Sequence, residues 1–149
     1  MVRELRERCP GEVIVYLGDT ARVPYGTRSA ETVIKYALGC ARILVERGVK
    51  AIVVACNTVS AVALDMLRIE LDLPILRVIV PGARAAVQAS GGRPIGVLGT
   101  TGTIASNAYP RAIAALSTRI EVLGQPAPLL VPLAEEGWID GPVPRLVVQ

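Results

Sequence analysis

Short runs of β-branched residues alternate along this chain with stretches whose apolar residues recur at helical spacing, and this alternation constrains the fold most strongly. The apolar runs predict strands at residues 12–19, 50–55, 74–80, 93–100 and 119–124. The periodic stretches predict helices at residues 2–8, 29–47, 59–71 and 104–116, and a short one from residue 132. Strands that alternate with helices are joined by right-handed crossovers, which make the strands parallel. The sequence therefore predicts an α/β fold in which helices flank parallel sheets.

The sequence also predicts where the longest helix begins and ends and where the chain divides into two lobes. Ser29 is the expected N-cap of the helix at 29–47 and Gly48 its expected C-cap. The strand–helix pattern restarts after Pro81–Gly82, so we expect a first α/β lobe over residues 1–80 and a second over residues 81–149.

Composition excludes several classes of protein. Hydrophobic residues make up 52% of the chain and aromatic residues 3%, which predicts a core of aliphatic side chains. The net charge of +3 comes from scattered residues, so we expect neither a nucleic-acid partner nor a membrane partner. No apolar run is long enough to span a bilayer, and the charged first residues do not resemble a signal peptide. We expect a cytoplasmic protein.

Three predicted strands end in loops of small polar residues. These loops are GDTARVPYG (18–26), CNTVS (56–60) and GTTGTIAS (99–106). In open parallel sheets ligands bind outside the carboxyl ends of the strands, so the three loops should share one rim. Backbone N–H groups and Thr and Asn side chains there suit a ligand that carries a carboxylate.

Cys56 is the residue with the strongest chemical interest. It lies where a strand ends and a helix begins, a position that lowers a thiol's pKa, but a buried core cysteine explains it equally well. The chain has no histidine to serve as the base of a cysteine hydrolase, so proton transfer is the favoured chemistry for a reactive thiol. Cys40 lies on the apolar stripe of its helix and is interpreted as a core residue, whereas Cys9 has no assigned role.

Other candidate residues leave alternatives open. Thr100 and Thr103 could hold a carboxylate or cap a helix. Spacing favours a turn-forming Asp19 over an ionised site residue, and it does not decide whether Tyr25 faces a ligand. The three cysteines have no zinc-site spacing, and no lysine is placed to hold pyridoxal phosphate, so we expect neither a metal nor a cofactor.

Five motifs together resemble the glutamate racemases of the aspartate/glutamate racemase superfamily. In the family's order they are GDTARVPYG (18–26), ACNTVSA (55–61), the PGARAA segment, IGVLGTTGTIAS (95–106) and VPLAEEG (131–137). The first of them resembles glutamate racemases more specifically than the related aspartate and hydantoin racemases.

The resemblance implies a two-lobed enzyme that interconverts L- and D-glutamate without a cofactor and supplies D-glutamate for peptidoglycan, the cell-wall polymer. In this family one cysteine removes the α-proton and another returns a proton to the opposite face. The resemblance assigns Cys56 as the first of that pair, and a homodimer is the expected assembly. It also implies that substrate is bound by six residues, namely Tyr25, Gly26, Asn57, Thr58, Thr100 and Thr103.

The resemblance also indicates how this chain differs from the family's full sequence pattern. The family's opening strand with its Asp-Ser-Gly loop precedes the first motif seen here, and the family's Gly-Cys-Thr-His-Tyr-Pro motif follows the last, so we expect an incomplete form of the enzyme. Two hypotheses follow: a glutamate racemase by descent, or a non-catalytic remnant that binds glutamate or a protein partner.

Overall fold

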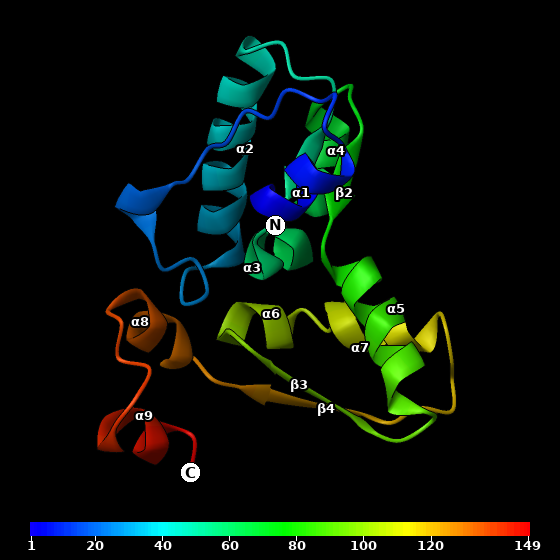
Figure 1. Cartoon of the computed structure of the whole chain (residues 1–149), viewed down its shortest axis with the longest axis vertical. Helices are drawn as coiled ribbons and strands as arrows, with labels where there is room; N and C mark the ends of the chain where they lie inside the picture. Colours follow the sequence, from blue (N-terminus) through cyan, green and yellow to red (C-terminus); the bar gives the residue numbers. More distant parts are fainter.

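The computed structural model describes all 149 residues, and Figure 1 shows a first half that lies against a second half. The elements of the first half are α1 (Val2–Arg8), the 3₁₀ turn η1 (Thr20–Arg22), α2 (Ala30–Glu46), β1 (Ile52–Val54), α3 (Asn57–Val62), α4 (Leu64–Glu70) and β2 (Ile75–Arg77). The elements of the second half are α5 (Ile79–Ser90), β3 (Ile95–Gly99), α6 (Thr101–Ala105), α7 (Ala108–Ala114), β4 (Val122–Pro126), α8 (Leu130–Glu135) and α9 (Pro142–Val147).

Each half contains one two-stranded parallel sheet, which confirms the predicted α/β class. Strand β1 pairs with β2, with Ile52 opposite Ile75. Strand β3 pairs with β4, with Ile95 opposite Val122. The two sheets fall on either side of residue 80, and α5 runs unbroken across residues 80–83. The division into lobes 1–80 and 81–149 stays a prediction.

Aliphatic side chains form the core, as the composition predicts. In the first half α2, α3 and α4 pack around β1 and β2, and Val33, Ala63 and Leu67 are almost completely buried. In the second half α5 packs on α7, where Ile79, Ala83 and Ile113 are at most 1% exposed. Helices α3 and α6 contact each other between the halves (Figure 1). That contact brings the polar loops of the two halves together.

The predicted strand at 12–19 is wrong. Residues 13–18 form neither helix nor strand, make no backbone hydrogen bond and join neither sheet. Val13 is 93% exposed and Tyr16 75% exposed. A strand is stabilised by a hydrogen-bonded neighbour, which β-branched composition alone does not supply. The predicted strand at 74–80 is also shortened, because α5 begins at Ile79.

Two predicted helices are each divided in two. The helix at 59–71 is interrupted at Ala63, which ends α3 and precedes α4. The helix at 104–116 is interrupted before α7 by Asn107, whose φ of 53° lies in the left-handed region that asparagine tolerates. Pro110 is then the third residue of α7, where a backbone N–H has no acceptor within the helix. A new helix start therefore accommodates the proline.

The remaining helix predictions agree with the structure, with one addition. Helices α1 and α2 lie where expected, and the Ser29 hydroxyl caps α2 by accepting from the N–H of Thr32 at 3.2 Å. Gly48 follows the end of α2 with φ of 71°. The short helix α8 forms near residue 132, and α9 lies in the Pro/Gly-rich tail for which no element is predicted. No helix has the length and apolar character that crossing a membrane requires.

Candidate functional site

Three threonine hydroxyls from two of the polar loops meet in one hydrogen-bonded cluster. The Oγ1 of Thr58 lies 2.9 Å from that of Thr100 and 3.4 Å from that of Thr103, and the last two lie 3.0 Å apart. Thr58 and Thr103 are each 4% exposed. Thr100 also caps α6 by accepting from the N–H of Thr103, so the capping interpretation holds for Thr100. The cluster joins the start of α3 to the start of α6.

The first polar loop reaches the same cluster through Gly26. The N–H of Gly102 donates to the carbonyl oxygen of Gly26 at 3.2 Å. A Cβ on Gly26 would lie 2.3 Å from both the Cβ and the Cγ2 of Thr100, so only glycine fits at this distance. All three loops that were predicted to share a rim therefore contribute residues to one place.

Cys56 is the residue immediately before α3, and its side chain is exposed. Strand β1 ends two residues earlier, and the turn is anchored by the Ser60 hydroxyl, which donates to the carbonyl of Val54 at 3.1 Å. The core interpretation of Cys56 is therefore wrong. A thiol that solvent reaches is also one that a bound molecule can reach.

Asn57 follows Cys56 and is held by a residue that the sequence did not single out. Its Oδ1 accepts a hydrogen bond from the hydroxyl of Tyr109, in the first turn of α7, at 2.7 Å. Burial raises the pKa of Tyr109. The only sequence signal for Tyr109 is its position soon after the third polar loop, in the segment SNAYPR (106–111).

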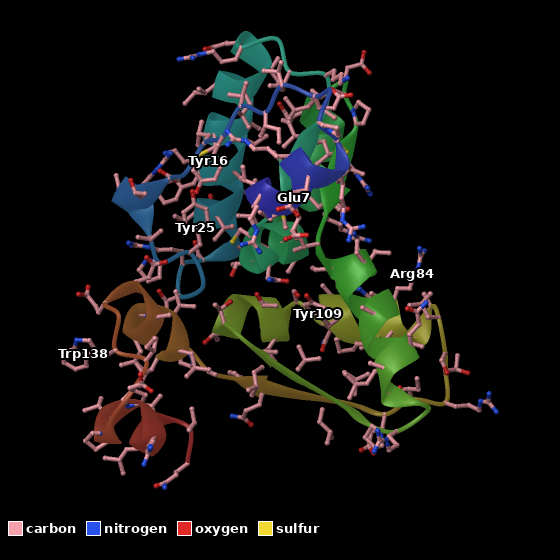
Figure 2. The ribbon with its side chains drawn as sticks, in the orientation of Figure 1. Glu7, Tyr16, Tyr25, Arg84, Tyr109 and Trp138 are labelled. Atoms are coloured by element: carbon pink, nitrogen blue, oxygen red, sulfur yellow. The ribbon has the colours of Figure 1, made fainter.

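The predicted site residue Tyr25 belongs to a polar cluster between the first loop and α2. Its hydroxyl donates to the carboxylate of Asp19, which also forms an ion pair with Arg22 at 2.7 Å. The Arg22 guanidinium lies 4.6 Å from the centre of the Tyr36 ring, and one of its nitrogens contacts the Cys40 sulfur at 3.6 Å. Figure 2 shows Tyr25 on the loop beside the lower end of α2. The Tyr25 hydroxyl is thus already occupied within the chain.

The ionisation of this cluster follows from its contacts. Burial alone would raise the pKa of Asp19, but the hydrogen bonds from Tyr25 and Arg22 and the Arg22 charge outweigh it and hold that pKa below its usual value. Burial, then the hydrogen bond to Asp19, raises the pKa of Tyr25. Asp19 is therefore an ionised residue of this cluster. Its side chain makes no capping hydrogen bond to the turn, so the turn-forming interpretation is wrong.

The other two thiols lie on other elements. Cys40 is half-buried on α2, so its interpretation as a core residue holds only in part, and burial followed by the charge of Asp19 raises the pKa of its thiol. Cys9 is exposed after α1. No group of three or more His, Cys, Asp or Glu side chains is arranged to hold a metal ion.

Two cavities lie near these elements. One of about 310 Å³ opens beside the threonine cluster and includes Thr58, Gly102, Ser106 and Arg28 in its lining. The other, of about 260 Å³, is lined by residues of α3, α4, β2, α5 and α7 and contains none of the predicted site residues.

Comparison with known proteins agrees with this arrangement. Residues 1–135 match the family described as Asp/Glu/Hydantoin racemase. The chain is 48% identical over 149 residues to a glutamate racemase of Geobacter metallireducens, and this alignment covers all of the chain and 55% of that relative. A glutamate racemase of Aquifex aeolicus is 47% identical over 149 residues, with 58% of its length covered.

Solved structures extend the likeness to three dimensions. Glutamate racemase from Francisella tularensis in complex with D-glutamate superposes with a TM-score of 0.88 at 40% identity, over 98% of this chain and 55% of that one. The enzyme from Aquifex pyrophilus gives a TM-score of 0.85 at 47% identity, over 99% of this chain and 57% of that one. The chain thus spans about half the length of the relatives that it matches. On its sequence and its structure alike, this chain belongs to the Asp/Glu/hydantoin racemase family.

Proposed function

We propose that this chain binds glutamate and carries Cys56 as a proton-transferring thiol of a glutamate racemase. The observation that carries the proposal is the meeting of Gly26, Thr58 and Thr100 in one cluster, with the exposed Cys56 two residues before Thr58. The whole length of the chain aligns with glutamate racemases, and one such relative is known in complex with D-glutamate.

Hydrogen-bond donors at this place suit a ligand with two carboxylates. Backbone N–H groups at the start of α3, threonine hydroxyls and the Asn57 amide can all donate to carboxylate oxygens. In the proposal Tyr25 contributes through its ring and backbone, because its hydroxyl is bound to Asp19. These contacts orient the α-carbon of glutamate toward the Cys56 sulfur.

The proposed chemistry is proton transfer at the α-carbon. The Cys56 thiolate takes the α-proton, which leaves the bonding electron pair on carbon and a neutral thiol on the protein. Reprotonation from the same thiol restores the starting configuration, whereas an acid on the opposite face gives the mirror image. Inversion therefore requires a second group beyond Cys56.

The proposal includes the wider role that the resemblance implies. It places the parent enzyme in the cytoplasm, without a cofactor, as a homodimer that supplies D-glutamate for peptidoglycan. Sedimentation velocity over a range of concentrations tests the dimer, and a single monomeric species at every concentration would contradict it.

One observation favours the second candidate function, a glutamate-binding protein without racemase activity. The three thiols lie on three separate elements: Cys9 follows α1, Cys40 is on α2 and Cys56 precedes α3. Cys40 contacts Arg22 in the Asp19 cluster and makes no hydrogen bond with Asn57 or Thr58.

Glutamate binding is tested by titrating D- and L-glutamate into the ¹⁵N-labelled chain and following its amide resonances. We expect the largest shifts at Gly26, Asn57, Thr58 and Gly102, and much smaller ones with lysine, which lacks the side-chain carboxylate. Thr58→Val, which removes one hydroxyl of the cluster, should weaken binding. Shifts confined to other regions, or none at millimolar glutamate, would refute the proposal.

A further inference from the structure

Tyr109 connects α7 of the second half to the first residue of α3. Its hydroxyl donates to Asn57 Oδ1 at 2.7 Å, across 52 positions of sequence. Asn57 lies directly between Cys56 and Thr58, so this bond ends inside the proposed site. Figure 2 shows Tyr109 where α5, α6 and α7 approach one another.

A third helix, α5, limits the space around the Tyr109 side chain. A Cβ on Gly82 of α5 would lie 3.3 Å from the Tyr109 oxygen and 3.5 Å from its Cε1. The α5 backbone therefore runs close beside the ring, and a side chain at Gly82 would press on the hydroxyl. Helices α5 and α7 also pack on each other, with α7 crossing behind α5 in Figure 1.

Holding one end of an amide fixes the direction of the other end. The carbonyl oxygen of Asn57 is occupied by Tyr109, and its Nδ2 makes no hydrogen bond within the chain. A primary amide nitrogen carries two donors, and a carboxylate accepts without donating. With its oxygen bound, Asn57 has both of these donors free for a ligand, at the position that follows Cys56 in the sequence.

We propose that Tyr109 is a positioning residue of the site: by binding the carbonyl oxygen of Asn57 it aims the Asn57 amide nitrogen at a carboxylate of the bound amino acid. The inference deepens the proposed function and rests on it. Because burial raises the pKa of Tyr109, the phenol keeps its proton and remains a donor at neutral and mildly alkaline pH.

Tyr109→Phe tests this role because it removes only the hydroxyl. Tyr16→Phe is the matched control, since Tyr16 is 75% exposed and its hydroxyl makes no hydrogen bond. The first readout needs no ligand: ¹⁵N relaxation of the Asn57 side-chain amide should change from a rigid order parameter to one below about 0.6. The second is glutamate affinity, which should fall about three- to tenfold, the range expected for one neutral hydrogen bond.

The two readouts separate this inference from the proposed function. If the wild-type chain binds no glutamate, the proposed function fails, while the relaxation of the Asn57 amide still decides whether Tyr109 positions it. Equal relaxation in wild type and Tyr109→Phe overturns the inference, and so does a mobile Asn57 with unchanged glutamate affinity. If Tyr109→Phe does not fold, Gly82→Ala shifts the Tyr109 ring together with its hydroxyl by a few tenths of an ångström, and the same two readouts decide.

Discussion

At the scale of single residues, the site depends on the close approach of Gly26 to Thr100. Gly26 has no side chain because the Thr100 methyl and hydroxyl fill the space that one would need. The family motif marked Gly26, Thr58, Thr100 and Thr103 in advance, and the structure places all four together. No local pattern in the sequence could indicate the Tyr109–Asn57 bond, because it depends on how α7 packs against α5.

Gly26→Ala should destabilise the chain by about 1–3 kcal/mol, because the new methyl group overlaps Thr100 and forces the first loop away from α6. The matched control is Gly39→Ala within α2, where an added Cβ meets no atom within 4 Å. That change should stabilise by about 0.5–1 kcal/mol through helix propensity. Urea unfolding measures both, and equal midpoints for the two variants would contradict the close approach.

Asp19→Asn should lower stability most at neutral pH and least in acid. The folded chain holds the pKa of Asp19 below its ordinary 3.8, so the ionised carboxylate stabilises the fold above that pH. This contribution is lost as the pH falls through the lowered, folded-state pKa. Urea unfolding of both proteins between pH 3 and 7 should give curves that converge toward the acid end. A constant difference across that range would show that the charge of Asp19 is not the cause.

At the scale of elements, the sequence predicts where helices and strands lie better than it predicts which strands pair or where a helix is interrupted. Apolar periodicity places α2 within one residue at each end, because Ser29 and Gly48 mark its limits chemically. It fails for residues 12–19, where strand formation depends on a neighbour that is distant in sequence. It also misses the breaks at Ala63 and Asn107, because the same apolar spacing fits one bent helix or two short ones.

Ser29→Ala should shorten or loosen the start of α2. The hydroxyl of Ser29 accepts from the N–H of Thr32, and losing such a cap costs about 1 kcal/mol. Ser117→Ala is the control, because the Ser117 hydroxyl makes no hydrogen bond. Amide hydrogen exchange of residues 31–33 should speed up in Ser29→Ala alone. Unchanged exchange there would mean that packing, not the cap, holds the first turn.

At the scale of the whole molecule, the site exists only because the two halves meet. Thr58 and Asn57 come from the first half, whereas Thr100, Thr103 and Tyr109 come from the second. The sheet of β3 and β4 packs Ile104 of α6 against Gly99 and Gly124, while its other face exposes Leu98 and Leu123. An exposed apolar face of this kind is suited to packing against another protein surface.

In the proposed function, Cys56 moves the α-proton of a glutamate bound at this junction. The most direct test is proton NMR of L-glutamate incubated with residues 1–149 in deuterated water, followed by chiral analysis of the product. We predict loss of the α-proton signal with mostly retained configuration, because one thiol returns the proton to the face from which it came. Cys56→Ser should abolish the exchange, and Cys40→Ser should not. Exchange that persists in Cys56→Ser, or none with the wild-type chain under conditions where glutamate binds, would show that Cys56 does not transfer the α-proton.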